Sequence, residues 1–379
     1  MIINNIKLVL EHEVVEGSLE VQDGIIRRVA QGASQLPQGI DGEGGWLIPG
    51  LIELHTDNMD KFFMPRPHVD WPAHSAMSSH DALMVANGIT TVLDAVAIGD
   101  VRDGGDRLEN LQKMVEAVIN SQRNGRNRAE HRLHLRCELP HHSTVPLFEQ
   151  LVNKPGVSLV SVMDHSPGQR QYVSYAKYRE YHQSKYHLTD AEMDEFSEEQ
   201  IGLANRWSAP NRAAIADICR QRHLALASHD DAKPEHVAES AALGSVIAEF
   251  PTTETAAQAS REYGLQVLMG APNIVRGGSH SGNVAANRLA ALGLLDILSS
   301  DYYPASLLDA AFRIAQDDAN RFTLPQAVKL VTLNPANALG LKDRGLIAEG
   351  RRADLVLVKQ SQDGHVYVKD VWQQGRQVF

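Results

Sequence analysis

The sequence predicts an α/β protein: a (β/α)₈ TIM-like barrel with a small β-sandwich domain formed by both chain termini. Two observations lead to this prediction. Short apolar runs alternate with segments of helical periodicity, and both ends of the chain read as β-strands separated by turns. Uninterrupted apolar runs are typical of parallel strands buried on both faces, and eight of them with helical crossovers indicate a barrel. The 379 residues are enough for a barrel and a smaller module.

The apolar runs are rich in Val, Leu and Ile, and each ends in polar residues or proline. In chain order they cover residues 47–57, 89–95, 134–140, 157–165, 224–231, 245–251, 266–273 and 295–304. Between them, segments such as DRLENLQKMVEAVI and SLLDAAFRIAQ repeat apolar residues at helical spacing. We therefore expect helical crossovers between parallel strands.

Two parts of the chain do not fit the barrel pattern. Residues 1–48 read as a β-meander that ends in the Gly-rich turn DGEGG, and residues 342–379 return to the same style. We expect both segments to build one β-sandwich, which leaves residues 49–341 for the barrel. The Tyr-rich, charged stretch 169–210 predicts a helical insertion between the fourth and fifth strands, where it can shape the mouth of a site.

Charge and composition exclude several classes of function. A formal net charge of −11 disfavours binding to nucleic acid or to an anionic membrane. No apolar run reaches the length of a membrane span, and the N-terminus lacks the features of a signal peptide, so we expect a cytoplasmic protein. Two cysteines, Cys137 and Cys219, cannot build a disulfide scaffold. An anionic small substrate stays open if a cleft supplies local positive groups or metals.

The tripeptide His55-Thr56-Asp57 ends the first barrel strand. Side chains two residues apart on a strand point the same way, so this imidazole and this carboxylate could bind one metal in the barrel mouth. The alternative is a capping histidine and aspartate in a loop.

Four more strands end in a residue type that binds metals. They are Glu138 on the third strand, His165 on the fourth, His229 on the fifth and Asp301 on the eighth. Each alone has a structural alternative: an ion pair of Glu138 with Arg136, a core histidine, or a helix cap. Together they place His, Asp or Glu at the carboxyl ends of five strands, where barrel enzymes build their sites. Three histidines and three carboxylates suit zinc or manganese, with a carboxylate bridging two ions.

Segments along nearly the whole chain resemble a known family. LIPGLIELHTDNMD with GITTVLDA is similar to the opening of amidohydrolase-superfamily enzymes, and TLNPANALGLKDRGLIAEGRRADLVLV is similar to their return to a β-sandwich. More narrowly, HLRCELPHH, MDHSPGQRQ, ASHDDA, EFPTT and APNIVRGGSHSGN resemble diphosphatases of the carbon–phosphorus lyase pathway of phosphonate utilisation. Most of the superfamily begins with His-x-His, and many members use a carboxylated lysine as bridge. Here Asp57 replaces the second histidine, and Glu138 is the candidate bridge.

The resemblance implies hydrolysis of a ribose 5-triphosphate, a small phosphorylated sugar, to the 5-phosphate and diphosphate in phosphonate catabolism. Two divalent metal ions, zinc or manganese, would lower the pKa of water, and Asp301 would accept its proton. We assign His55, Asp57, Glu138 and Asp301 to one metal. Glu138, His165 and His229 would hold the other.

A triphosphate brings several negative charges to a protein whose net charge is already −11. Candidate substrate-binding residues therefore lie in the cationic and amide-rich loops after the strands. They are Lys61, Arg66, His141, Arg170 and Lys233, followed by the segment Arg276, Gly277, Gly278, Ser279 and His280. The glycines let backbone N–H groups approach phosphate oxygens, and the apparent helix NVAANRLAALG that follows would favour an anion at its N-terminus. The alternative for this segment is a flexible surface loop.

Two other functions stay open at this level. A cyclic amidohydrolase or deaminase could use the same barrel, but the basic Gly-rich segment favours a phosphate over an uncharged ring. A non-catalytic scaffold of amidohydrolase ancestry would be expected to lose metal ligands, whereas all the candidate ligand positions at the strand ends carry His, Asp or Glu. The sequence carries no signal for a protein partner, and a homo-oligomer stays open.

Overall fold

The structure, a computed structural model, describes residues 1–32, 38–66, 69–99, 106–172, 174–279 and 282–379. Contacts divide the chain into two compact units. Unit 1 comprises Met1–Asp94, Ala117–Arg132 and Met269–Phe379, and unit 2 comprises Ala95–Glu116 and Leu133–Leu268. The expected boundaries at residues 48 and 342, between sandwich and barrel, stay a prediction.

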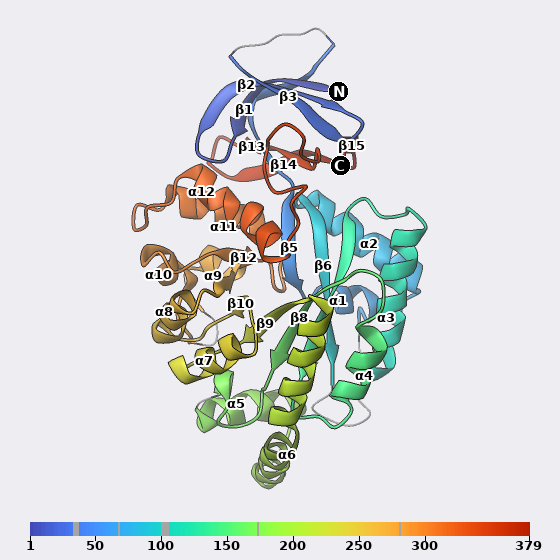
Figure 1. Cartoon of the computed structure of the whole chain (residues 1–379), viewed down its shortest axis with the longest axis vertical. Helices are drawn as coiled ribbons and strands as arrows, with labels where there is room; N and C mark the ends of the chain where they lie inside the picture. Colours follow the sequence, from blue (N-terminus) through green and yellow to red (C-terminus); the bar gives the residue numbers. More distant parts are fainter. Residues whose placement is uncertain (33–37, 67–68, 100–105, 173, 280–281) are drawn as a thin grey trace. The chain divides into compact units, whose positions relative to one another are not determined.

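The strands of both termini lie side by side in one seven-stranded mixed sheet of unit 1 (Figure 1). The order is β15-β14-β13-β4-β1-β2-β3. The strands are β1 Ile2–Val9, β2 Val14–Gln22, β3 Ile25–Gln31, β4 Ile40–Pro49, β13 Leu355–Gln360, β14 Val366–Gln373 and β15 Arg376–Gln377. Strands β1 and β4 pair in parallel, so the two ends of the chain meet where β4 also pairs with β13. The prediction of a small β-domain formed by both chain termini is therefore confirmed; its strands form one mixed sheet, where a β-sandwich was expected.

The segment DGEGG, expected to be a turn, lies inside β4 instead. The pairing with β1 shifts there, since Asn4 faces Asp41 and Ile6 faces Gly45, which makes a bulge in β4. Glycine is required at Gly42, because a Cβ there would lie 2.1 Å from Ile6 Cγ2. The glycines thus serve a close approach of two strands and a bulge, which a sequence pattern does not distinguish from a turn.

A second sheet has eight strands in the order β12-β11-β10-β9-β8-β7-β6-β5 and forms a nearly closed parallel barrel. The strands are β5 Leu51–Thr56, β6 Ile89–Ile98, β7 Glu130–Glu138, β8 Val157–Met163, β9 Ala225–His229, β10 Ile247–Glu249, β11 Gln266–Gly270 and β12 Ile297–Ser299. Each of the predicted apolar runs contains or overlaps one of them. All residues of β5 are buried, as expected for a parallel strand covered on both faces.

Helices follow the strands along the chain. They are α1 Met59–Phe63, α2 Ala73–Ala86, α3 Asp106–Arg123, α4 Thr144–Leu151, α5 Tyr175–Tyr186, α6 Asp190–Arg222, α7 Pro234–Ala242, α8 Glu254–Glu262, α9 Ala271–Arg276, α10 Ala286–Ala291, α11 Ser306–Gln316, α12 Leu324–Lys329 and α13 Leu333–Ala338, with a short 3₁₀ turn at Arg170–Tyr172. The segments predicted to be helical form α3 and α11. Within the described part of the chain, no helix combines the length and the apolar character that crossing a membrane requires.

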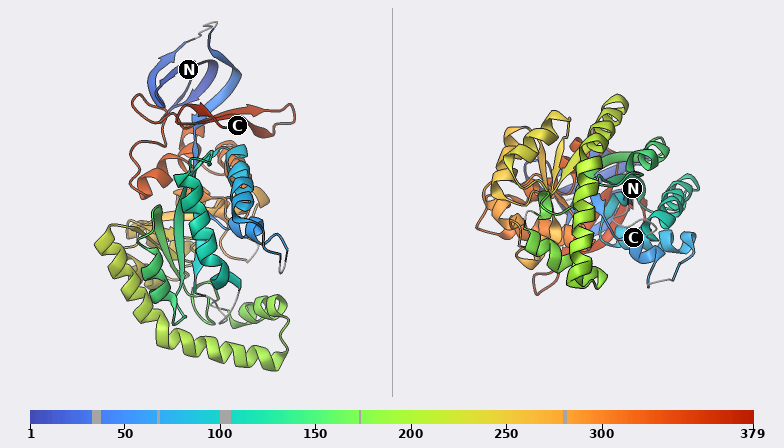
Figure 2. Two further views of the ribbon diagram at one scale, coloured as in Figure 1. Left: turned by 90° about the vertical axis from the view of Figure 1, so that its right-hand side faces the viewer. Right: turned by 90° about the horizontal axis from the view of Figure 1, so that it is seen from below.

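Between β8 and β9, unit 2 carries α5 and the long helix α6 (Figure 2). A capping box begins α6: Glu192 N–H donates to the Thr189 hydroxyl, and Thr189 N–H donates to the Glu192 carboxylate. Tyr178 on α5 packs with Met193 and Phe196 on α6, so the two helices share a small core of their own. The helix continues past Pro210, and Figure 2 shows it bent, as expected where proline removes a backbone donor.

A buried network of two histidines and two aspartates joins α2, β6 and β7 within unit 1. The Asp94 carboxylate accepts from His80 Nε2 at 2.6 Å and from His131 Nδ1 at 2.7 Å, and His131 Nε2 lies 3.3 Å from Asp81. Two ligands of one tetrahedral zinc, each at about 2.0–2.1 Å, would be about 3.3 Å apart. The shorter contacts at Asp94 are therefore hydrogen bonds rather than the spacing of a metal site.

Burial by itself would lower the pKa of His131, but Asp94 and Asp81 raise it to about 9. The folded protein therefore holds His131 as an imidazolium with a carboxylate at each nitrogen. A raised folded-state pKa gives a stabilisation that is complete below the unfolded value of about 6.5 and is lost as the pH rises through about 9.

We predict that the unfolding free energy falls between pH 7 and pH 9.5, with His131 contributing on the order of 3 kcal/mol. The variant His131→Asn should be less stable at pH 7 and should lose less stability over this range. Denaturant titrations at several pH values measure both effects. Equal pH slopes for the two proteins would contradict the prediction.

Candidate metal centre

In unit 1, His55, Asp57 and Asp301 bring their side chains together. His55 is the second-last residue of β5 and is buried, whereas Asp57 and Asp301 are half-buried. Each offers one ligand atom within 4.8 Å of the others, and His55 Nε2 lies 3.6 Å from Asp57 Oδ1. This separation exceeds a good hydrogen bond and is close to that of two ligands on one cation. These three residues could therefore hold a divalent metal.

The backbone fixes this arrangement. The Asp57 N–H donates to the Asp301 carbonyl at 3.0 Å, and the Asp301 N–H donates to the His55 carbonyl at 3.1 Å. Asp301 has a φ of 54°, in the left-handed region that costs a non-glycine residue energy. Its side chain is thus held in place by surrounding structure rather than by its own backbone preference.

In unit 2, Glu138 and His165 form a tight pair. The Glu138 carboxylate accepts from the backbone N–H of His165 at 3.0 Å and from its Nδ1 at 2.7 Å. Burial opposes the charged imidazole, but Glu138 and Asp230 raise the pKa of His165 to about 10. The negative charge of Glu138 is therefore balanced by the proton that His165 carries. A bound divalent cation would displace this proton.

His229 lies beside this pair. Its Nε2 is 3.4 Å from Asp230 Oδ2, and His165 Nε2 is 3.6 Å from the same oxygen. The ligand atoms of these three residues lie within 4.8 Å of one another. Asp230, like Asp301, has a left-handed φ, here 56°. A second group in unit 2 could thus hold a metal, with Glu138 next to it.

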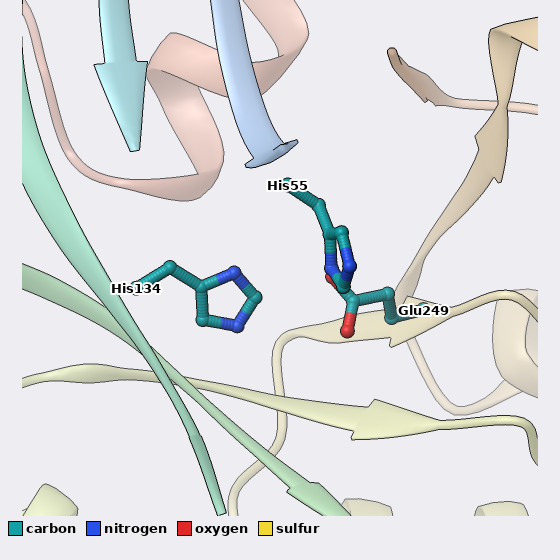
Figure 3. A group of neighbouring side chains, drawn as sticks. All are labelled: His55, His134 and Glu249. Atoms are coloured by element: carbon teal, nitrogen blue, oxygen red, sulfur yellow. The ribbon is translucent and has the colours of Figure 1, made fainter. Parts of the chain in front are cut away.

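Glu249, on β10, orients His229. Its carboxylate accepts from His229 Nδ1 at 2.8 Å, which directs Nε2 toward Asp230. A carboxylate behind a histidine is typical of metal sites, because it fixes the ring and makes the ligand more basic. Figure 3 shows that Glu249 and His134, both on strands of unit 2, point toward one another, and their ligand atoms lie within 4.8 Å.

The sequence interpretation missed three buried groups: Asp230, Glu249 and Glu53. Glu249 ends its strand as Glu138 does, so the rule that selected Glu138 also points to it. Asp230 directly follows His229. Glu53 is two residues before His55 and accepts the His55 N–H at 2.7 Å; burial raises its pKa to about 7 despite this bond.

Several expected substrate-binding residues already have partners. Arg170 is buried and pairs with Asp231 and with Glu239, which also binds Arg212, so its charge is balanced within unit 2. His141 is buried and accepts from the Ser143 N–H and hydroxyl.

The ammonium of Lys61 donates to the Tyr302 carbonyl at 2.7 Å and to Asn58 Oδ1 at 3.1 Å. Lys61 is therefore held next to the residue that follows Asp301. Arg66 and Lys233 are exposed, and Lys233 precedes the first turn of α7. The substrate contacts expected of these cations stay a prediction.

The Gly-rich segment caps a helix. Arg276 ends α9, and Gly277, with a φ of 80°, donates to the Ile274 carbonyl while Gly278 donates to the Asn273 carbonyl. These two N–H groups are therefore engaged in the helix cap, and phosphate contacts of Gly277, Gly278 and Ser279 stay a prediction. His280 lies outside the described residues. The helix expected after this segment, α10, is short and begins only at Ala286.

Comparison with known proteins gives a match along the whole chain. The sequence is 73% identical over 379 residues to the alpha-D-ribose 1-methylphosphonate 5-triphosphate diphosphatase of Escherichia coli (strain K12), which covers 100% of both chains. The chain belongs to the amidohydrolase family. The family model itself matches residues 212–379. A shorter match, 39% identical over 82 residues, joins 21% of this chain to 14% of an adenine deaminase of Ligilactobacillus salivarius (strain UCC118).

Solved structures share the amidohydrolase fold along the chain. A 5-methylcytosine deaminase from Klebsiella pneumoniae superposes with a TM-score of 0.64 at 16% identity, covering 100% of this chain and 98% of that one. An N-acetyl-D-glucosamine-6-phosphate deacetylase from Mycobacterium smegmatis gives a TM-score of 0.64 at 17% identity, covering 100% of both. At this identity the likeness concerns the fold alone.

We predict that Glu249→Ala weakens the binding of zinc or manganese about 10- to 100-fold, because His229 loses the group that orients its ring. Competition with a chelating dye measures the affinity. Glu262→Ala, an exposed carboxylate on α8 of the same unit, is the matched control and should bind as the original protein does. Unchanged affinity in Glu249→Ala would remove the orienting role.

Proposed function

We propose that this amidohydrolase-family protein hydrolyses alpha-D-ribose 1-methylphosphonate 5-triphosphate to the 5-phosphate and diphosphate, in phosphonate catabolism. The observation that carries the proposal is the 73% identity, over the full length of both chains, to the Escherichia coli diphosphatase. The side-chain groups of the candidate metal centre support a metal-dependent hydrolase.

The two groups of donors suit two divalent cations, zinc or manganese. His55, Asp57 and Asp301 would hold one, and His165, His229 and Asp230, with Glu138, would hold the other. This assignment adds Asp230 to the ligands expected from the sequence. Bound divalent cations would neutralise phosphoryl oxygens and lower the pKa of water.

The protein's own side chains would place and move the proton. Asp301 is the proposed base: its carboxylate is half-buried, and backbone hydrogen bonds to His55 and Asp57 fix its position at the strand ends. It can accept a proton from the water that attacks phosphorus. Lys61 donates to the carbonyl of Tyr302, the next residue, so its positive charge lies beside Asp301. We infer that Lys61 helps to offset the negative charge of the substrate there.

The expected reaction products test the function directly. Metal-loaded protein should release diphosphate and the ribose 5-phosphate from the 5-triphosphate, measured by phosphorus NMR or coupled diphosphate detection. Ammonia should not be released from adenine or cyclic amides. Ammonia without diphosphate would replace the proposal by a deaminase or cyclic amidohydrolase.

We predict that Asp301→Asn lowers kcat by about 10²- to 10⁴-fold, since the amide cannot accept the proton. Metal content measured on the same sample separates loss of the base from loss of a metal. Asp309→Asn, on α11 of the same unit, removes an ion pair with Arg313 and should leave kcat unchanged. Turnover near that of the original protein in Asp301→Asn would eliminate this residue as the base.

A further inference from the structure

The barrel has a seam at β5 and β12, the first and last strands in the order of its sheet. Among the described residues, one isolated parallel bridge joins the two sides of this seam, between Thr56 and Asp301. The same seam carries the proposed metal ligands His55 and Asp57 on one side and the proposed base on the other. Their relative placement therefore depends on how the seam is held.

Glu53 spans this seam. One carboxylate oxygen accepts the His55 N–H at 2.7 Å, and the other accepts the Ser300 N–H at 2.6 Å. Ser300 directly precedes Asp301, and Glu53 lies two residues before His55 on β5, in the part of the strand where the pairing with β6 shifts its register. The side chain thus adds a hydrogen-bonded link between β5 and the residue after β12, at a seam whose two sides are joined by a single described backbone bridge.

Burying the Glu53 carboxylate destabilises the fold unless its oxygens accept hydrogen bonds. Glu53 has a relative exposure of 0%, and an isolated buried carboxylate is strongly unfavourable without hydrogen bonds. An apolar residue at this position would remove the carboxylate that accepts from both buried N–H groups. The carboxylate therefore fixes the distance between the strand of His55 and the strand end of Asp301. A reacting group must be held within about 0.5 Å of its working position.

We propose that Glu53 is a positioning residue of the proposed diphosphatase: its carboxylate closes the seam and sets the placement of Asp301 relative to His55 and Asp57. The inference rests on the proposed function in taking Asp301 as the base. It assigns no contact of Glu53 with substrate or metal.

The test replaces one carboxylate oxygen by an amide group in Glu53→Gln, which can accept one of the two N–H groups but not both. The protein is loaded with cobalt(II), whose visible absorption reports the geometry of its ligands. The matched control is Glu130→Gln, also in unit 1, whose carboxylate accepts from Arg344 at 2.8 Å and Arg352 at 2.6 Å in an ion-pair cluster. Both variants lose contacts of a buried or half-buried carboxylate.

In Glu53→Gln we expect a shifted cobalt spectrum and a kcat lower by at least about tenfold, with KM changed by less than about threefold. Glu130→Gln should lower the melting temperature and leave the spectrum and kcat unchanged. An unshifted spectrum and an unchanged kcat in Glu53→Gln would overturn the proposal, whatever its melting temperature.

Two further outcomes are decided by the same readouts. If Glu53→Gln does not fold, Glu53→Asp takes its place. It keeps the charge but is shorter by one methylene, so we expect it to lose at least one of the two hydrogen bonds and to give the same spectral shift. If the original protein releases no diphosphate, the proposed function fails. The cobalt spectrum still decides whether Glu53 sets the geometry of the seam.

Discussion

The convergence of strand ends at the barrel seam is the constraint on which the rest of the candidate site depends. Parallel strands bring their carboxyl ends to one edge, but β5 and β12 are the outer members of the sheet order and are joined by a single described bridge. Backbone bonds among His55, Asp57 and Asp301, together with the carboxylate of Glu53, hold this edge. Side chains from β5 and from the end of β12 can bind one cation only if the distance between these two strand ends is fixed.

Charge balance shapes the donors of unit 2 in a similar way. Glu138, Asp230 and Glu249 are buried, and each lies against a histidine, so that none is an isolated buried charge. If a divalent cation bound here and the histidines released their extra protons, the negative charge of these carboxylates would still be balanced. The buried Arg170, in contrast, is neutralised by Asp231 and Glu239 and ties the loop after β8 to α7.

Much of the fold could be predicted because parallel strands that are buried on both faces appear in the sequence as continuous apolar runs. The apolar runs, the helices α3 and α11 and the strands of both termini follow from local periodicity. The DGEGG segment shows the limit of this approach. Glycine signals a special backbone conformation, but whether that is a turn or a bulge depends on the partner strand, here β1.

By itself, the sequence determined which residue types stand at the ends of the strands, since apolar runs and the histidines and carboxylates after them are local features of the chain. Only the tertiary structure decided which of these groups meet. Asp230 joins His165 and His229, Glu249 stands behind His229, and the N–H groups of Gly277 and Gly278 turn back to cap α9. The physical reason is that hydrogen bonds and ion pairs depend on distances across strands, and those distances are fixed only when the sheet has formed.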